Sequence, residues 1–371
     1  MSKNIVILGG SYAGLHIAHY LLKHPVPDTK VILVSKNDHF FWNLATVRAI
    51  VPGQIKDEQI FAPLAKALER YPSSSYELVI GAATKADFDG KTVAVALADG
   101  TTRAIPYAQL VLATGSRCAD DHPVPWKAAG SHAEAAALLG ATRDRVAAAS
   151  SYVVAGAGAT GVEVAGELGF EYGKDRSVVL LSAGAEILGG DSSAGAARAE
   201  LKKLGVKVRT GAKVAGTKAL PDGKTEVSLE GGETITTDVY LPTMGLVPNS
   251  EYVDGKYLND RGNVVVDEKF RVKGQADVWA AGDIVGKPRC GFMITQKHAA
   301  GVAKNVELVL KGKEALVVKD PPIDIFACAV GRGRGAGRLG PVKALSIMIW
   351  LAKGRTLAVE RMAGYIDGSV A

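Results

Sequence analysis

The feature that most constrains the fold is a glycine-rich turn near the middle of the chain, Gly156-Ala157-Gly158-Ala159-Thr160-Gly161. Apolar residues 152–154 precede it and predict a buried strand, and a run with helical spacing follows it. In a G-x-G-x-x-G turn the first glycine permits a tight bend, the second lets a pyrophosphate approach the backbone, and the third lets helix and strand pack closely. The turn therefore predicts a dinucleotide site, although alone it is also compatible with an empty turn.

A second strand, turn and helix of the same kind opens the chain at residues 4–14. Gly9, Gly10 and Gly14 belong to this turn, and Ser11 stands where the middle glycine is usual. A small hydroxyl side chain still allows a pyrophosphate to approach and can donate a hydrogen bond to it. Taken alone, the segment is compatible with a nucleotide loop and with a plain turn.

Both predicted units lack the acidic residue that usually holds the ribose hydroxyls at the end of the second strand. The first such strand, residues 30–34, ends at Ser35, and the second, residues 177–181, ends at Ser182. A serine can make one hydrogen bond to a ribose. No arginine cluster follows the second strand, so the sequence does not choose between NADH and NADPH.

Length and composition predict two or three domains with many tight turns, because the chain has 371 residues, 43 glycines and only 6% aromatic residues. The apolar run at residues 344–352 is about half of what a bilayer crossing requires. Residues 1–4 lead into a strand without signal-peptide features, and Ser2 stands where N-myristoylation requires glycine. We therefore expect a soluble cytoplasmic protein without a lipid anchor.

The three cysteines are far apart and form no C-x-x-C pair. Cys118, Cys290 and Cys328 are therefore expected to be buried or semi-buried thiols rather than a disulfide framework, a thiolate zinc site or a redox-active dithiol. The sequence predicts no metal site.

Two further turns have the character of a flavin site. An apolar strand ends in Ala113-Thr114-Gly115, and a later one ends in Gly282-Asp283. The glycine of the later turn lets the chain approach a ligand, and the carboxylate can bind ribityl hydroxyls. The helix predicted at residues 296–306 follows, and its positive end could face the flavin pyrimidine.

The last segment is basic. Residues 325–366 contain seven arginines and lysines and a single acid, Glu360. Such a surface could contact anionic lipid headgroups or nucleic acid. The alternative is a solvated basic face over an apolar helix, in which Leu345, Ile349 and Trp350 form a core stripe.

Together these segments resemble the two-dinucleotide-binding-domain flavoproteins, the pyridine nucleotide-disulfide oxidoreductase superfamily, without its dithiol. Within that superfamily they are most similar to the apoptosis-inducing-factor-2 or ferroptosis-suppressor branch. The similarity rests on the overall length and on residues 43–49, 161–163, 298, 330–340 and 353–355.

The resemblance implies an α/β fold with two Rossmann-like dinucleotide-binding domains, the second inserted in the first, and a small C-terminal α+β domain that closes over the flavin. The expected boundaries are 1–120 and 246–318 for the FAD-binding domain, 121–245 for the NAD(P)H-binding domain, and 319–371 for the C-terminal domain.

The resemblance also implies the cofactors FAD and NADH or NADPH, with roles for individual residues. Lys353 would lie near the flavin and the quinone entrance, and Glu163 would hold the nicotinamide carboxamide; these two are the expected catalytic residues. The residues expected to bind cofactors are Gly9, Gly10, Ser11, Gly14, Ser35, Asn43, Arg48, Thr114, Gly115, Gly282, Asp283 and His298 for FAD, and Gly156, Gly158 and Gly161 for NAD(P)H.

In the segment that would carry the dithiol in related reductases, an aromatic cluster with Asn43 and Arg48 could shape the flavin pocket. The alternative for Phe40, Phe41 and Trp42 is the start of a plain core helix.

The activity implied is NAD(P)H-dependent reduction of a quinone-like small molecule. Two departures from the branch, Ser2 at the myristoylation position and Ala358 where an aromatic residue is expected, leave the acceptor and the membrane attachment open. The alternatives are a flavin oxidoreductase of a small-molecule biosynthetic pathway and a redox-sensing protein that binds nucleic acid or membranes. Peripheral contact with an anionic or mitochondrial membrane stays open, and the oligomeric state does not follow from the sequence.

Overall fold

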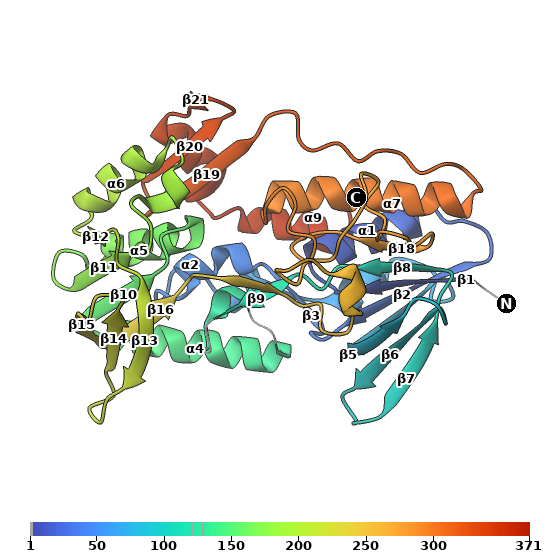
Figure 1. The fold of residues 1–371 in the computed structure, drawn as a ribbon, viewed down its shortest axis with the longest axis horizontal. Coiled ribbons are helices and arrows are strands. Elements are labelled where there is room, and N and C mark those ends of the chain that lie inside the picture. Colours follow the sequence, from blue (N-terminus) through green and yellow to red (C-terminus); the bar gives the residue numbers. More distant parts are fainter. Residues whose placement is uncertain (1–2, 120–121, 128–129) are drawn as a thin grey trace.

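The computed structural model describes residues 3–119, 122–127 and 130–371. Two parallel sheets form the centres of two lobes, which Figure 1 shows at opposite sides of the molecule. The two-domain α/β architecture expected from the sequence is confirmed.

The sheet of the first lobe has the strand order β18-β8-β1-β2-β5-β6-β7, and its first five strands are parallel. β5 is long enough to continue past the parallel part and to pair antiparallel with β6, which in turn pairs with β7. The strands are β1 (Lys3–Leu8), β2 (Thr29–Ser35), β5 (Tyr76–Asp87), β6 (Thr92–Leu97), β7 (Thr102–Pro106), β8 (Gln109–Leu112) and β18 (Val278–Ala280).

The second lobe lies between β8 and β18 in the chain, so it is an insertion in the first. Its parallel sheet has the order β12-β11-β10-β16, and a three-stranded antiparallel sheet, β13-β14-β15, follows β12 in the chain. The strands are β10 (Ser151–Ala155), β11 (Ser177–Leu181), β12 (Lys207–Arg209), β13 (Val214–Ala219), β14 (Thr225–Leu229), β15 (Thr234–Thr237) and β16 (Val239–Pro242).

The two chain segments that cross between the lobes pair with each other. β9 (Ser116–Cys118) runs into the second lobe, β17 (Leu246–Pro248) runs back, and they form an antiparallel pair. This two-stranded ribbon follows the Ala113-Thr114-Gly115 turn, so it connects the first lobe's site to the second lobe.

The helices that matter for the site start directly after the glycine turns. α1 (Tyr12–Lys23) follows β1, and α5 (Ala159–Tyr172) follows β10. α7 (Phe292–Leu310) packs against α1 beside the first sheet (Figure 1). The remaining helices are α2 (Thr46–Ala49), α3 (Leu64–Leu68), α4 (His132–Ala148), α6 (Ala194–Lys203), α8 (Ser346–Ile349) and α9 (Met362–Ile366).

The C-terminal segment contacts both lobes. Its sheet of β19 (Ile325–Val330), β20 (Arg334–Leu339) and β21 (Val342–Lys343) packs on α5 and α6 of the second lobe, as the red strands of Figure 1 show. α9 then returns to α1 and α3 of the first lobe. The chain end therefore bridges the two nucleotide units.

One of the two alternatives for the aromatic segment at residues 40–42, the start of a core helix, is wrong. Phe40 and Phe41 belong to β3 (His39–Phe41), which pairs with β4 (Phe61–Pro63), and do not begin a helix. Phe40 and Trp42 are fully buried. Their ring partners include Tyr12 of α1 and Tyr365 of α9, which favours a fixed extended segment here.

The expected core stripe of the C-terminal segment is also wrong in part. Ile349 is buried, but Leu345 is 67% exposed. The cysteines agree with expectation, since Cys328 is buried and Cys118 and Cys290 are partly buried. Within the described residues, no helix combines the length and apolar character that a membrane crossing requires.

Candidate flavin and nicotinamide site

A cavity of about 1690 Å³ connects the two glycine turns and the C-terminal segment. Parallel strands place their carboxyl ends at one edge of the sheet, where ligands of open α/β folds bind. Most of the residues expected from the sequence to bind cofactors or to act in catalysis line this cavity. They are Gly9, Gly10, Ser11, Ser35, Asn43, Thr114, Gly115, Gly158, Glu163, Gly282, Asp283 and Lys353.

The first turn requires glycine at two positions. Gly9 has φ +111°, and a Cβ on it would lie 2.3 Å from the carbonyl oxygen of Ala113. A Cβ on Gly14 would lie 1.7 Å from the carbonyl oxygen of Gly9, so helix and strand meet too closely for any side chain. Ser11 caps α1 with its backbone but makes no side-chain capping bond. The first amide groups of α1 therefore face the cavity and suit an anion.

The second turn has the same geometry, and the space beside one of its glycines is open. A Cβ on Gly161 would lie 1.8 Å from the carbonyl oxygen of Gly156, so these two glycines hold strand and helix together. A Cβ on Gly158 would meet no atom within 4 Å. Gly158 has φ −72°, a backbone angle that any residue adopts, so packing of the protein does not require glycine there. The missing side chain leaves room for a ligand at the helix N-terminus, which fits a pyrophosphate.

Asp283 lines the cavity and has a charged partner. Its Oδ2 accepts hydrogen bonds from Lys127 Nζ at 2.6 Å and from Ser116 Oγ at 3.1 Å. Burial alone would raise the pKa of Asp283, but the charge and hydrogen bond of Lys127 outweigh it and hold this pKa below its usual range. Asp283 is thus a carboxylate that accepts hydrogen bonds inside the cavity, as ribityl hydroxyl groups require.

The hydroxyl and amide groups around the first turn already have partners. Ser35 Oγ donates to the carbonyl oxygen of Asn37 at 2.6 Å, and Thr114 Oγ1 donates to that of Asn249 at 2.7 Å. Asn43 donates to the carbonyl oxygen of Trp126 at 2.6 Å and accepts from the hydroxyl of Tyr12 at 3.0 Å. Ser35 is therefore left as an acceptor toward a ribose, and Asn43 mainly fixes the wall.

Glu163 and Lys353 form an ion pair in the cavity wall, with 2.5 Å between Oε1 and Nζ. Oε1 of Glu163 also accepts the backbone N–H of Ala329 at 3.0 Å. Burial opposes the charge of Lys353, but the carboxylate of Glu163 outweighs it and raises the pKa of Lys353 above its usual value. The pair places a fixed cation in the cavity, at the joint between α5 and the C-terminal sheet.

Five residues expected to bind cofactors lie outside the cavity lining that the described residues form: the glycines Gly14, Gly156 and Gly161, and the side chains of Arg48 and His298. Arg48 donates to Glu167 Oε1 through Nε and Nη2, at 2.9 and 2.7 Å, and to the carbonyl oxygens of Gly354 and Arg355. His298 is buried against Phe270, and its Nε2 lies 3.0 Å from Asp320 Oδ1. Their observed contacts are with protein, so these two side chains position the wall.

Gly156 and Gly161 also lie behind the lining, where they shape the turn that exposes Gly158.

Lys127 was missed by the sequence analysis. It lies in the single helical turn Pro125–Lys127, and neighbouring Trp126 donates from Nε1 to the carbonyl oxygen of Pro242 at 2.9 Å. The sequence signal was a tryptophan and a lysine in a proline-rich linker, which alone favours an ordinary surface segment. Only the fold brings this linker against Asp283.

Comparison with known proteins agrees with this geometry. A family model described as pyridine nucleotide-disulphide oxidoreductase matches residues 3–303. Oxidoreductase ptaL of Pestalotiopsis fici is 39% identical over 374 residues, which cover 99% of this chain and 100% of that protein. Ferroptosis suppressor protein 1 of Mus musculus is 26% identical over 373 residues, which cover 96% of this chain and 94% of that protein.

Two solved structures illustrate the fold. The sulfide:quinone oxidoreductase of Aquifex aeolicus has a TM-score of 0.77 at 17% identity and covers 100% of this chain and 93% of its own. The water-forming NADH oxidase of Lactobacillus brevis, bound to NADH, has a TM-score of 0.69 at 21% identity and covers 91% of this chain and 75% of its own. At these identities the likeness concerns the fold alone.

Proposed function

Because the chain belongs to the pyridine nucleotide-disulphide oxidoreductase family, we propose that it passes electrons from NAD(P)H through FAD to a quinone-type acceptor. Its two glycine turns fit the two cofactors of that family, FAD and NADH or NADPH. The observation that carries the proposal is the single cavity that both glycine turns share with Lys353. Its volume of about 1690 Å³ exceeds the roughly 300–1,000 Å³ of a pocket for one small ligand. The space suits a cofactor together with a second ligand.

FAD, when bound, supplies the chemistry by taking a hydride equivalent from NAD(P)H and giving two electrons to the acceptor. The protein supplies binding and orientation. The N-termini of α1 and α5 are proposed to hold the two pyrophosphates, and the carboxylate of Asp283 is proposed to accept hydrogen bonds from ribityl hydroxyls. Gly158 leaves the space that lets the nicotinamide dinucleotide approach the backbone.

Lys353 is proposed to act as the cation that stabilises negative charge arriving in the cavity, or as the donor of a proton to the product. Its raised pKa keeps the ammonium charged at neutral pH. Glu163 holds that ammonium in place and keeps its pKa high. The earlier expectation that Glu163 holds the nicotinamide carboxamide stays a prediction, and one oxygen of this carboxylate is already committed to Lys353 and Ala329.

The C-terminal part of the chain contributes apolar side chains to the cavity lining. They are those of Ile323, Ile325, Phe326, Leu339 and Ala358. A flat, largely apolar molecule with two carbonyl oxygens suits this wall, with Lys353 as the polar group that orients it. This match supports a quinone-type acceptor.

The test is the absorption spectrum of the purified protein with and without NADH or NADPH, followed by turnover with a panel of short-chain quinones. We expect a flavin spectrum that bleaches under anaerobic addition of the nucleotide and recovers on addition of a quinone. A fully flavinated protein that bleaches but does not recover with any quinone would remove the quinone proposal and leave the cofactor assignment intact.

The second candidate is a flavin oxidoreductase acting on an aromatic intermediate of a small-molecule pathway. It is favoured by Ala358, which lines the cavity with a methyl group and leaves room for a larger ring system than an aromatic residue would. Ala358→Phe separates the two candidates. The substitution should leave turnover of a small benzoquinone within about twofold and should abolish turnover of a fused-ring substrate, because only the larger molecule needs this space.

Peripheral contact with an anionic membrane is proposed as a property of the same C-terminal segment. Val342, Leu345, Ile347, Met348 and Leu351 are exposed there, with Val342 and Leu345 at 66% and 67%. Contiguous exposed apolar side chains are uncommon on proteins that do not use them for contact. We call these five residues the apolar patch.

The charges around the apolar patch favour lipid over nucleic acid. Arg338 is paired with Asp191 and Asp324, and Arg332 with Glu167 and Glu171, so these two arginines are largely neutralised. The exposed cations that flank the patch are Arg334, Lys343 and Arg355. An apolar surface with a few flanking cations matches an anionic bilayer.

Flotation with vesicles of phosphatidylcholine and phosphatidylserine tests the contact. Leu345→Ser with Leu351→Ser should reduce vesicle binding at least about tenfold, since each change removes apolar area. The control is Leu316→Ser, at a leucine that is 58% exposed outside the patch. Equal binding of all variants, or binding to duplex DNA in place of vesicles, would count against the membrane.

A further inference from the structure

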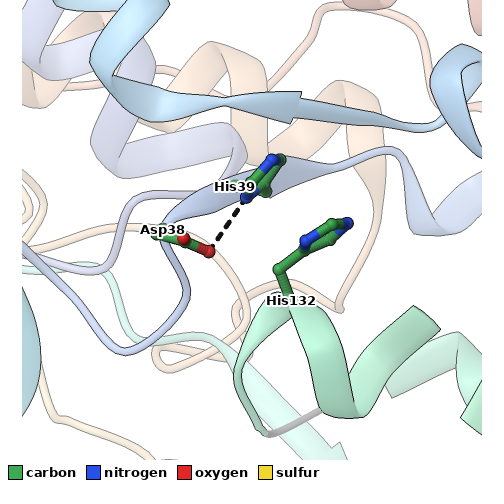
Figure 2. Close-up of side chains that lie close together, drawn as sticks. All are labelled: Asp38, His39 and His132. Carbon is green, nitrogen blue, oxygen red and sulfur yellow. Dashed lines mark hydrogen bonds and ion pairs between the residues drawn. The ribbon is translucent and has the colours of Figure 1, made fainter. Parts of the chain in front are cut away.

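Three side chains able to bind a metal ion meet at the wall of the cavity, of which His39 is part. Figure 2 shows Asp38 and His39, at the start of β3, facing His132, the first residue of α4. The two imidazole rings are stacked, with their centroids 3.7 Å apart and 19° between their planes. Asp38 Oδ1 lies 2.9 Å from His39 Nδ1.

The ligand atoms of the three residues are close enough to share an ion. One atom from each residue lies within 4.8 Å of the other two. Around a tetrahedral zinc ion with bonds of about 2.0–2.2 Å, the ligand atoms are roughly 3.3–3.6 Å apart. The cluster therefore has to contract by up to about 1.5 Å, and one imidazole has to turn out of the stack, because each ring nitrogen binds a metal through a lone pair in the plane of its ring. Asp38 is exposed, and both imidazoles are partly exposed, so side-chain rotations can provide this change without moving the backbone.

The backbones that carry the three residues are held in place. β3 pairs with β4, and the N–H of Leu64 donates to the carbonyl oxygen of Asp38 at 2.9 Å. The start of α4 is fixed by a capping box between Ser131 and Glu134. The ring of Phe61 meets that of His132 edge to face at 4.8 Å. The two segments are thus brought together by the fold, independently of any ion.

We propose that Asp38, His39 and His132 form a binding site for a divalent transition-metal ion of the zinc type, with water completing the coordination. Two imidazoles and one carboxylate are a ligand set that zinc accepts with one position left for water. Mg²⁺ and Ca²⁺ prefer oxygen ligands and are disfavoured by two imidazoles. The cysteine spacing led us to predict no metal site, and the two histidines of this cluster are 93 positions apart and form no spaced motif.

The position of the site gives it a consequence for the rest of the molecule. His39 also lines the cavity, whereas His132 starts the helix that follows the linker out of the first lobe. An ion bound by both would cross-link the cavity wall to α4. We expect zinc to stabilise the folded protein and to slow exchange of the ligand in the cavity.

The test uses the full chain as purified with its flavin, freed of metal by chelation and then titrated with zinc sulfate against a chromogenic zinc chelator. We expect one tightly bound zinc per chain, at micromolar dissociation constant or below. His132→Ala should weaken that binding at least tenfold, and Asp38→Asn, nearly isosteric at an exposed position, should weaken it several-fold. His24→Ala is the matched control, since His24 is an exposed histidine at the end of α1 and should leave zinc binding unchanged.

Thermal unfolding provides a second readout. Zinc at 100 times its dissociation constant should raise the melting temperature of the wild type by several degrees and leave the melting temperature of His132→Ala unchanged. Magnesium should change neither melting temperature. Equal zinc affinity in His132→Ala, Asp38→Asn and wild type would place any bound zinc elsewhere, for example on the cysteines, and overturn the proposal. Wild-type binding only at millimolar zinc would also overturn it. None of these outcomes depends on the acceptor that the enzyme reduces.

Discussion

Glu163 and Lys353, which are 190 positions apart in the chain, form an ion pair with 2.5 Å between carboxylate and ammonium in the wall of the cavity. Glu163 comes from the helix of the second glycine turn, and Lys353 comes from the C-terminal segment. The same carboxylate accepts the N–H of Ala329 in β19. One acidic side chain therefore joins the second nucleotide unit to the C-terminal segment and holds the ammonium group of Lys353 in the cavity wall.

The first prediction concerns the pH profile of turnover. Glu163 raises the pKa of Lys353, so Glu163→Gln should lower that pKa and move the alkaline limb of the rate profile to lower pH. Glutamine keeps an oxygen for the N–H of Ala329, so the fold should persist. Lys353→Met should lower the rate at neutral pH by about 100- to 10,000-fold, the range of general acid–base catalysis, and remove the limb.

The measurement is the turnover rate between pH 7 and pH 10.5 at saturating nucleotide, with flavin content checked in each variant. Because the pKa of Lys353 is raised above its usual value of 10.5 in the wild type, its limb should enter this range only in Glu163→Gln. Lys343→Met, at an exposed lysine of the same segment, is the control. An alkaline limb that stays in place in both Glu163→Gln and Lys353→Met would mean that another group titrates.

Much of the fold followed from the sequence because its signals are local. The two glycine turns each occupy six consecutive residues, and the strands before them are short apolar runs that a parallel sheet buries on both faces. The pair Gly231-Gly232 between two short strand-like runs is a local hairpin signal, and β14 and β15 form that hairpin. The alanine-rich run at residues 131–149 is a local helix signal, and it contains α4.

The parts that could not be predicted depend on contacts between distant segments. Arg48 could be singled out from the sequence, but nothing in the sequence paired it with Glu167, which lies 119 positions away. Phe40 to Trp42 form an apolar run too short to distinguish a strand from a helix, and pairing with β4 decided the outcome. Lys127 and Asp283 are 156 positions apart, so their ion pair had no local signal.

The second prediction concerns flavin retention. Asp283→Ala should purify with less than about a tenth of the wild-type flavin, because it removes the partly buried carboxylate that lines the cavity and leaves Lys127 without its partner. Absorbance at the flavin maximum relative to protein absorbance measures the content. Asp222→Ala, at an exposed turn between β13 and β14, is the control and should retain flavin. Normal flavin content in Asp283→Ala would remove the ribityl assignment.

The third prediction concerns acid stability. Glu307 of α7 accepts hydrogen bonds from Tyr20 of α1, Lys304 and Lys311, at 2.8, 2.9 and 2.5 Å. Burial would raise the pKa of Glu307, but these donors outweigh it and lower the pKa to about 2. A lowered folded-state pKa gives stability that is present above the unfolded value near 4.5 and is lost as pH falls toward 2.

Glu307→Gln should therefore be less stable than the wild type at pH 7, by about 1 kcal/mol once solvent screening of the two exposed lysines is considered. The difference should shrink steadily below pH 4.5. Urea unfolding at a series of pH values from 7 to 3 measures it. A difference that is the same at every pH would show that packing, and not the charge of Glu307, stabilises the contact between α1 and α7.

The fourth prediction tests whether the second turn has a glycine at position 158 to leave room for a ligand or to let the protein pack. A Cβ on Gly158 meets no protein atom within 4 Å, and its backbone angles suit any residue, so Gly158→Ala should fold with unchanged stability. The added methyl group would occupy the space proposed for the pyrophosphate. It should therefore raise the KM for NADH or NADPH at least about tenfold, which corresponds to ~1.4 kcal/mol of lost binding.

Two other glycines make the comparison decisive. Gly140→Ala, inside α4 where a Cβ also meets no atom within 4 Å, should leave KM unchanged and raise stability by about 0.5–1 kcal/mol, because alanine favours a helix interior over glycine. Gly161→Ala should instead unfold the second lobe, because its Cβ would lie 1.8 Å from the carbonyl oxygen of Gly156. Steady-state kinetics, flavin content and thermal unfolding of the three variants measure these effects. If Gly158→Ala kept its KM, the nucleotide would have to bind elsewhere, because no protein contact accounts for a glycine at this position.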